Sequence, residues 1–429
     1  MNPPATAGLK RTLSEPIRRT SSFYERAVLD ALQQMTRGCL QLELPDGFRC
    51  VLGQTDATER ASVRIVRPNF FKRCVLYGDV GFGEAYVEGD WETPDITAVI
   101  AWFILNVENS PGMSGSRSRR IALNLLGWYN RIQHLLRPNS LDTSKRNIAE
   151  HYDLGTDFYR LFLDPTMTYS AADFAALGNT LEQAQIAKYD RLCRQLRLRP
   201  GEHVLEIGSG WGGFSRHAAT QYGCEVTTIT ISQAQFEYAQ QLFQREGLAD
   251  RVHPKLMDYR LLTGRYDKIV SIEMLEAVGD AYLETYFGKC QQLLKPEGLL
   301  ALQMITCPDA RYNAMRRGVD WIQKHIFPGS LLLSINRVNQ AISRTGDLML
   351  HDLHDLGLDY AETLRRWRQE FNRNGAEVAA LGFDERFRRK WNYYLSYCEA
   401  AFARRNISVV QAIYTRANNP TLMSLGGNS

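Results

Sequence analysis

The sequence has no apolar run long enough to cross a bilayer. Its longest, AVIAWFILNV at residues 98–107, has ten residues, whereas a transmembrane helix needs about 20. Nor does an apolar run follow the basic residues near the N-terminus, as a secretory signal requires. We therefore expect a cytoplasmic protein in which residues 98–107 form a core segment or a helix lying on a surface.

Cysteine is present without the spacing that would give it a structural role. The eight cysteines are scattered, and no two of them form a C-x-x-C pair. This spacing argues against zinc sites and against a disulfide framework. We expect reduced, mostly buried thiols and no bound metal.

The net positive charge of the chain is small, and most of it lies near the N-terminus. The formal net charge is +4, and residues 1–22 supply +3 of it through Lys10, Arg11, Arg18 and Arg19 against Glu15. A Ser-, Pro- and Arg-rich leader of this kind predicts a disordered tail, and its charge can also attract it to anionic phospholipid headgroups. No base-flipping or base-stacking pattern accompanies this charge, so we expect no nucleic-acid partner.

The chain is long enough for several domains, and its first part predicts a small α+β domain over residues 23–110. A helix at 24–36 precedes CLQLELPDGFRCVLG, which predicts a hairpin, and ASVRIVRPNFFKRCVLYG predicts further strands. A flexible boundary follows, and the linker at 111–146 contains IALNLLGWYNRIQHLL, an amphipathic helix that either packs or touches a membrane.

The second part, residues 147–418, alternates strands and helices before a flexible tail at 419–429. HVLEIG, EVTTITIS, YDKIVSIE and GLLALQMI are separated by helical runs. This alternation predicts a doubly wound α/β fold, a parallel sheet with helices on both faces that binds ligands at the carboxyl ends of its strands. Two later helical segments, YAETLRRWRQEFNRN and ERFRRKWNYYLSYCEAAFARRN, are expected to cover that edge.

The stretch VLEIGSGWGGFSRHAATQYG at 204–223 runs from a buried strand through four glycines into a helix. A glycine loop lets a ligand approach the backbone, and the helix N-terminus offers N–H groups and a positive dipole to a carboxylate or phosphate. The run G-S-G-W-G-G is neither the dinucleotide nor the Walker pattern. With Glu206 two positions before the first glycine, it resembles the first motif of S-adenosylmethionine methyltransferases, which holds the methionine end of the cofactor.

Longer blocks resemble one family of such methyltransferases. HYDLGTDFYRLFLDPTMTYSAADF, VLEIGSGWGGF, TITISQAQ, IVSIEMLEAVG, ALQMI with DWIQKHIFPG, and DLGLDYAETLRRW occur in the order found in cyclopropane-fatty-acyl-phospholipid synthases. The mycolic acid cyclopropane synthases are the nearer relatives. The resemblance runs from about residue 24 to 418 and implies a class I methyltransferase sheet of the Rossmann-like type.

The resemblance also implies an activity. These enzymes add the methyl group of S-adenosylmethionine across a cis double bond of an unsaturated acyl chain in a membrane phospholipid, and close a cyclopropane ring. By the same resemblance, the domain at 23–110 engages the bilayer surface and dimerises. The protein is then a homodimer or higher oligomer, associated peripherally with the inner face of the cell membrane.

Two sets of site residues follow from matching positions within the family's blocks. The residues that would hold the cofactor are Tyr169, Ser170, Glu206, Gly208, Gly210, Trp211, Gly212, Thr230, Ile231, Gln235, Asp258 and Tyr259. In these enzymes a bound bicarbonate takes the proton. Its site would comprise the N–H of Ala171, Glu276, Gln303, the backbone of Ile305, and Tyr360.

The chemistry makes similar demands by itself. An alkene that attacks a sulfonium methyl becomes a carbocation, and aromatic faces stabilise such a charge without capturing it. Tyr169, Phe174, Tyr360 and Trp367 are candidates, with plain core packing as the alternative. Glu276 could act as the base or hold a smaller anionic base, unless it is a solvated helix-start residue. The segment 360–400 could exclude the water that would quench the cation.

Three positions depart from the bacterial pattern. Ala171 stands where cysteine is usual, and Gln303 and Ala277 stand where many members have histidine. Glutamine can hydrogen-bond an anion but cannot be protonated. The site of proton loss decides the product, so a methylene-branched chain of the tuberculostearate or furan-fatty-acid type is the alternative to a ring. An inactive lipid-binding protein is the third hypothesis.

Overall fold

The computed structural model describes residues 22–106, 154–176 and 178–422. They form two compact units: residues 22–106 with 386–400, and residues 154–385 with 401–422. The stretch 386–400, which the sequence assigned to the methyltransferase domain, thus belongs to the first unit. The expected leader, the amphipathic helix after residue 120 and most of the C-terminal tail lie outside the described residues.

The first unit is a small α+β fold, as the sequence predicts. Its elements are α1 (Phe23–Gln33), β1 (Cys39–Glu43), β2 (Arg49–Gly53), β3 (Arg60–Ile65), α2 (Asn69–Val87), β4 (Trp91–Glu92) and α3 (Ile96–Leu105). The strands form one sheet in the order β2-β1-β3-β4. β1 and β2 make the expected antiparallel hairpin, and the apolar run forms α3, which buries Val99, Ile100 and Trp102.

One local prediction in this unit is wrong. Strands were expected throughout ASVRIVRPNFFKRCVLYG, but the chain is helical from Asn69 onward, with a non-helical residue at Gly78 (φ 59, ψ −132). Aromatic and β-branched residues favour strands locally. Burial overrides that preference here, since Phe70, Phe71 and Val80 of α2 are buried.

The second unit contains a seven-stranded sheet in the order β10-β11-β9-β8-β5-β6-β7. The strands are β5 (His203–Ile207), β6 (Glu225–Thr230), β7 (Val252–Leu256), β8 (Tyr266–Ile272), β9 (Leu294–Thr306), β10 (Leu348–Asp355) and β11 (Ser408–Arg416). This confirms the doubly wound α/β fold. The predicted strands pair in parallel, as expected, and the sheet is extended by β11, which was not predicted and pairs antiparallel with both β9 and β10.

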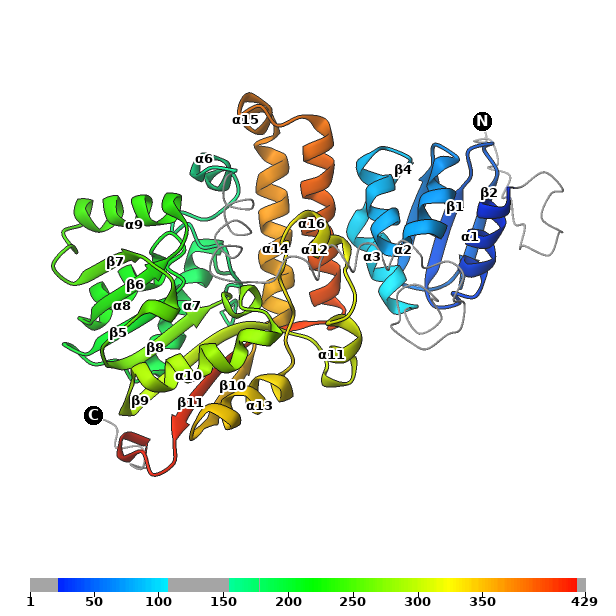
Figure 1. Ribbon diagram of the computed structural model, residues 1–429. Coiled ribbons are helices and arrows are strands. Elements are labelled where there is room, and N and C mark those ends of the chain that lie inside the picture. The colour runs from blue at the N-terminus through cyan, green and yellow to red at the C-terminus, as the bar shows by residue number, and fades with distance from the viewer. Residues whose placement is uncertain (1–21, 107–153, 177, 423–429) are drawn as a thin grey trace. The chain divides into compact units, whose positions relative to one another are not determined.

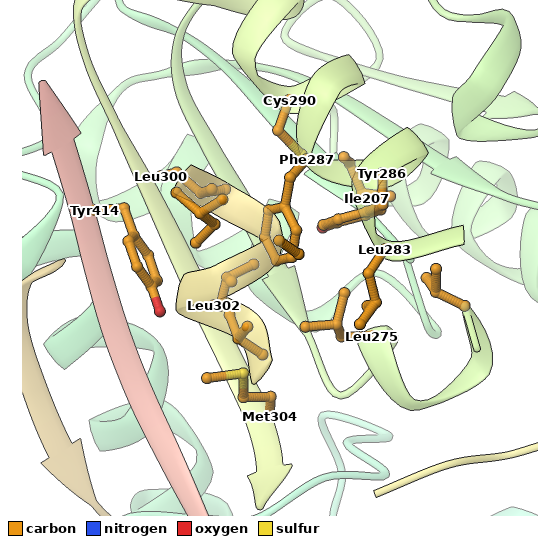
Figure 2. Packing of buried hydrophobic residues seen from close by; sticks show 14 of the residues in the cluster. Ile207, Leu275, Leu283, Tyr286, Phe287, Cys290, Leu300, Leu302, Met304 and Tyr414 are labelled. Atoms are coloured by element: carbon orange, nitrogen blue, oxygen red, sulfur yellow. The ribbon is translucent and has the colours of Figure 1, made fainter. Parts of the chain in front are cut away.

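Helices cover both faces of this sheet (Figure 1). α7 (Leu181–Gln195), α8 (Gly213–Tyr222) and α9 (Gln233–Arg245) share a buried cluster with Val204 and Val270. α10 (Leu283–Leu293) and α13 (Ile335–Thr345) share the opposite cluster with Leu205 and Ile269. Figure 2 shows part of this second cluster, in which side chains of α10 point toward those of β9. Alternate residues of each strand therefore enter opposite cores, as expected for a sheet covered on both sides.

The connections place the ligand edge. β5 lies between β6 and β8, so the chain changes direction across the sheet at the carboxyl end of β5, where such folds bind ligands. The remaining elements are α6 (Thr156–Arg160), η3 (Tyr259–Leu261), η4 (Leu275–Ala277), η5 (Asp280–Tyr282), α11 (Asp309–Met315), α12 (Trp321–His325), α14 (Gly357–Arg373), α15 (Gly375–Ala380), α16 (Glu385–Ala403) and η6 (Pro420–Leu422).

Two expectations drawn from composition can be checked. None of the helices in the described ranges is long and apolar enough to cross a membrane. All eight cysteines lie within those ranges without a disulfide; six of them are buried, and Cys74 and Cys398 are half-buried. The expectation of mostly buried thiols is confirmed.

Candidate active site

The glycine loop joins the end of β5 to the start of α8. Gly212 has φ 91, and a Cβ added there would lie 2.7 Å from the ring of Phe243, so packing requires this glycine. Gly210 also has a left-handed backbone (φ 49), yet a Cβ added there would meet no described atom within 4 Å. The loop is therefore packed underneath at Gly212 and borders open space at Gly210, where a ligand could approach.

Several amides of this loop are used inside the protein. The N–H groups of Gly208 and Ser209 donate to the carbonyl of Ile229 at 3.0 and 2.8 Å, and that of Gly212 donates to Ser209 at 2.9 Å. The expectation that the loop offers its N–H groups to a ligand is thus wrong for these three. They attach the loop to the end of β6 and fix its shape.

Glu206 lies beneath the loop, in the core rather than on a surface. Only 2% of it is exposed, and its carboxylate accepts hydrogen bonds from Ser215 and, at 2.6 Å, from Thr228 Oγ1. Desolvation raises the pKa of Glu206 to about 7, while the two hydroxyls and Lys188 oppose that rise. Glu206 can hold polar groups of a ligand only from within this network.

The predicted cofactor residues after β6 form a second wall. Thr230 Oγ1 donates to Gln235 Oε1 at 2.9 Å and accepts from the N–H of Ser232 at 3.1 Å. Ser232 is the N-cap of α9, and Ile231, half-buried, lies between the two. The side chains of Thr230 and Gln235 are therefore oriented before any ligand binds.

Asp258 and Tyr259 follow β7, on the same edge. Arg260, which the sequence analysis missed, donates two hydrogen bonds to the carboxylate of Asp258. Its Nε lies 2.8 Å from Oδ1 and its Nη2 lies 2.7 Å from Oδ2. The ring of Tyr259 packs against Tyr286 with centroids 5.2 Å apart. A ligand that bonds to Asp258 would therefore meet a carboxylate already paired with a guanidinium.

A buried lysine that the sequence analysis did not identify contacts the predicted residue Ser170. Lys188 of α7 is fully buried, and its Nζ donates to Ser170 Oγ at 2.7 Å. Desolvation lowers the pKa of Lys188 to about 8, and the charges of Glu273, Asp164 and Glu206 oppose that fall. This ammonium is thus the buried positive charge among the carboxylates of the site.

Three of the four predicted aromatic residues lie together. Tyr169 stacks on Trp367 with centroids 5.1 Å apart, and Tyr360 meets Trp367 edge-on at 6.0 Å. Trp211, from the glycine loop, joins them through Tyr159, whose ring lies 4.9 Å from Trp211 and 5.2 Å from Tyr169. Tyr360 and Trp367 come from α14, which supports the expectation that this helix covers the ligand edge.

The fourth aromatic residue, Phe174, packs against a guanidinium rather than against the other three rings. The guanidinium of Arg366 lies 4.4 Å from the centre of its ring, so that ring already faces a cation. The backbone N–H of Phe174 donates to Asp359 Oδ1 at 2.7 Å, and that of Ala172 donates to Thr363 Oγ1 at 3.1 Å. α14 thereby fixes the loop that carries Ala171.

A carboxylate that the sequence analysis overlooked, Glu273, follows β8 directly. Its Oε1 accepts from the N–H of Ala171 at 2.8 Å and from Nε2 of Gln303 at 2.8 Å. Desolvation raises the pKa of Glu273, and these donors, Lys188 and a hydrogen bond from Tyr360 oppose the rise. The residue as a whole is half-buried, while its carboxylate is held inside the site by these donors.

Glu276 lies one turn further, in η4 with Ala277. It is only 8% exposed, so the solvated helix-start alternative is wrong. The N–H of Ile305 donates to its Oε1, while its Oε2 is buried and has no hydrogen-bond partner in the part of the chain that the structure describes. Desolvation and the charge of Glu273 raise the pKa of Glu276 to about 8, so both effects favour its protonated form.

The arrangement suits a cationic ligand in a dry site. The carboxyl groups of Glu206 and Glu273, which follow or end β5 and β8, both interact with the ammonium of Lys188, and the side chain of Tyr360 lies beside Glu273. Such a site stabilises positive charge by Coulombic attraction and by cation–π interaction. A carboxylate held among donors can also accept a proton.

Comparisons with known proteins show the family to which the chain belongs. Residues 139–412 match the family model described as mycolic acid cyclopropane synthetase. The tuberculostearic acid methyltransferase UfaA1 of Mycobacterium tuberculosis is 37% identical over 406 residues, covering 92% of each chain. The cyclopropane-fatty-acyl-phospholipid synthase of Escherichia coli K12 is 36% identical over 361 residues, covering 83% of this chain and 88% of its own.

A solved structure shows the same fold. The mycolic acid cyclopropane synthase CmaA1, complexed with SAH and CTAB, is 32% identical, with a TM-score of 0.59 over 63% of this chain and 98% of its own. The family model matches more than half of the chain. The two relatives named above are more than 30% identical to it over most of its length. The chain therefore belongs to the mycolic acid cyclopropane synthetase family.

Proposed function

We propose that this protein transfers the methyl group of S-adenosylmethionine to a cis double bond of an unsaturated phospholipid acyl chain and closes a cyclopropane ring. The observation that carries the proposal is the meeting, at one edge of a methyltransferase sheet, of carboxylates at the ends of β5 and β8 with the rings of Tyr169, Tyr360 and Trp367. The names of the relatives above support the same class of reaction.

In this proposal the donor lies over the glycine loop. The open space at Gly210 admits its methionine end, and the wall of Thr230, Gln235 and Asp258 receives the nucleoside end. The carboxylate of Glu273 attracts the positive sulfonium. S-Adenosylmethionine supplies the electrophilic methyl group; the chain's own residues hold and orient the donor and exclude water.

The aromatic rings act on the acyl chain. An alkene that attacks the methyl group leaves a positive charge on the neighbouring carbon, and the half-buried ring of Tyr169 is available to such a charge. Trp367 is fully buried and packs behind Tyr169, as expected of a core residue. α14 also closes over the loop at 171–174 through Asp359 and Thr363. Water is thereby kept from the cation, which it would convert to an alcohol.

We also propose that the protein works at the surface of a bilayer, as a peripheral protein and as a dimer or higher oligomer. A phospholipid acyl chain must leave the bilayer to reach the buried edge of the sheet. The leader with four basic residues and Phe23 at the start of α1, which is 69% exposed, support a contact between the first unit and anionic lipid.

A methylene-branched product is the second candidate. It is favoured by the relative named tuberculostearic acid methyltransferase, which covers 92% of this chain. The two products differ in where the cation loses its proton. Mass spectrometry of the acyl chains, with NMR to separate ring protons from vinylidene protons, distinguishes them.

The test of the main proposal uses the purified full chain with methyl-labelled S-adenosylmethionine. Vesicles of a cis-unsaturated phospholipid should take up label in the acyl chain, and matched vesicles of a saturated phospholipid should not. The ring protons of cyclopropane should appear by NMR. Absence of label from the unsaturated lipid would contradict the proposal and favour an inactive lipid-binding protein.

A further inference from the structure

The groups expected to surround a bicarbonate are already occupied by the protein's own carboxylates. The N–H of Ala171 and the amide of Gln303 both donate to Glu273 Oε1 at 2.8 Å, and the side chain of Tyr360 also hydrogen-bonds Glu273. The N–H of Ile305 donates to Glu276. The backbone, amide and hydroxyl donors of the predicted site therefore each have a glutamate oxygen as partner, so these residues do not fit a separate bicarbonate.

The amide of Gln303 is held in the orientation that favours Glu273. Its Nε2 donates both to Glu273 Oε1 and, at 3.2 Å, to the carbonyl of Ala171, while its Oε1 accepts from Gln411 Nε2 at 3.0 Å. A flipped amide would set its oxygen against two acceptor oxygens. Gln411 lies opposite Gln303 in the pairing of β11 with β9, so the sheet itself fixes this donor toward Glu273.

Electrostatics also oppose an added anion. Glu273 and Glu276 interact strongly enough that the charge of Glu273 raises the pKa of Glu276, and Lys188 is shared with Asp164 and Glu206. A further anion placed beside Glu273 would be desolvated and would meet a like charge, while the ammonium of Lys188 is already shared. A positive ligand beside the pair is favoured by the same charges.

The backbone of Glu273 has a strained conformation, which the surrounding structure must stabilise. Glu273 has φ 48, in the left-handed region that glycine adopts without strain. Its N–H donates to the carbonyl of Gln303 at 2.7 Å, which holds the strained residue at the end of β8. Strain of this kind is found at functional sites, where the surrounding structure maintains it.

We propose that the carboxylate of Glu273 occupies the place of the bicarbonate and is itself the proton acceptor, so that the reaction needs no added anion. This inference rests on the proposed function. The alkene π pair forms the bond to the donor methyl carbon, and the carbon–sulfur pair stays on sulfur as S-adenosylhomocysteine. A Glu273 oxygen then takes a proton from the added methyl group, and the C–H pair forms the last ring bond to the cationic carbon. The proton later passes to solvent, which restores the carboxylate.

The first test needs no variant. Turnover of the full chain on unsaturated phospholipid vesicles is measured in buffer freed of carbon dioxide, and again after bicarbonate is added. The two rates should agree within about twofold. A rate that collapses without bicarbonate and returns with it overturns the inference, because a built-in base does not depend on an added one. Absence of turnover in both buffers would instead contradict the proposed function.

The second test compares two variants of one residue. Glu273→Gln keeps the size of the side chain but removes the base, and should lower turnover by about 100-fold or more whether or not bicarbonate is present. Glu273→Gly relieves the backbone and empties the position among the donors of Ala171, Gln303 and Tyr360. It should be equally slow without bicarbonate and recover about tenfold or more when bicarbonate is added.

Folding is checked by the binding of S-adenosylhomocysteine, measured by calorimetry, which both variants should retain. Full turnover of Glu273→Gln would overturn the inference, since an amide cannot accept the proton. Bicarbonate rescue of Glu273→Gly but not of Glu273→Gln is the result that a merely structural role of Glu273 would not produce.

Discussion

Glu276 is held in a site that disfavours its charged form, and this makes a prediction about stability. Desolvation and Glu273 raise its pKa from 4.5 to about 8 in the folded protein. The folded state then binds more protons than the unfolded state between these values, so the contribution of Glu276 to stability is present below about pH 4.5 and is lost as the pH rises through about 8.

Glu276→Gln should remove this loss. The variant should be more stable than the native protein at about pH 9, by roughly 2–5 kcal/mol, and should differ less at about pH 5. Chemical denaturation at the two pH values measures the difference. Glu237→Gln, at an exposed position on α9, is the matched control. Equal stability of Glu276→Gln and the native protein at both pH values would show that Glu276 is not buried as a protonated acid.

Some residues of the site could be found from short sequence patterns, whereas others could be found only from the structure. Glu276 and the glycine loop stand in patterns that can be found by spacing, and the structure places them at the ligand edge. Glu273 was overlooked, although an acidic residue directly after a strand is a signal, because only the sheet shows that it points toward Ala171 and Gln303. Lys188 was overlooked because a lysine on a helix is normally exposed; its place beside Leu192 and Tyr189 on the buried face of α7 was the available signal.

At the scale of elements, two glycines in the turn from β5 into α8 have different roles, one in packing and one in binding. Gly212→Ala would place a methyl group 2.7 Å from the ring of Phe243 at φ 91. Gly210→Ala would meet only the backbone penalty at φ 49, because an added Cβ touches no described atom within 4 Å. The two variants therefore report on different properties of the same loop.

Gly212→Ala should lower the free energy of unfolding by about 2–4 kcal/mol through crowding and backbone strain. Gly210→Ala should lower it by only about 1–2 kcal/mol, yet weaken the binding of S-adenosylhomocysteine about tenfold or more, since each 1.4 kcal/mol of lost contact is tenfold. Denaturation and calorimetry measure the two effects. If Gly210→Ala binds the ligand as the native protein does, the cofactor does not approach the loop at this glycine.

Elements with a regular pattern could be predicted, and those decided by distant contacts could not. β5, β6, β8 and β9 follow from apolar runs bounded by turns, and the hairpin of β1 and β2 from its turn residues. β11 has seven consecutive buried residues, a run typical of a central strand, but its antiparallel insertion between β9 and β10 depends on pairings across the sheet. The helix α2 likewise forms because burial overrides local preference.

At the scale of the whole molecule, charge is distributed unevenly, and this leads to the last prediction. Residues 1–22 carry +3 of the net +4, so most of the net attraction to an anionic surface is concentrated in that segment. Each basic residue near such a surface contributes about 1 kcal/mol at low salt. Replacing Lys10, Arg11, Arg18 and Arg19 by serine should therefore weaken binding to vesicles containing anionic phospholipid by about tenfold or more, as measured by co-sedimentation.

The position of the charge, rather than its amount, decides this prediction. The control replaces four exposed basic residues of the second unit, Arg199, Arg245, Arg251 and Lys255, by serine, which changes the net charge equally. If the leader meets the bilayer, the control should keep most of its binding, and the difference should vanish at high salt, where a Debye length of about 3 Å screens the charges. Equal weakening of both variants would mean that net charge alone attracts the protein to lipid, and that the leader has no particular place at the surface.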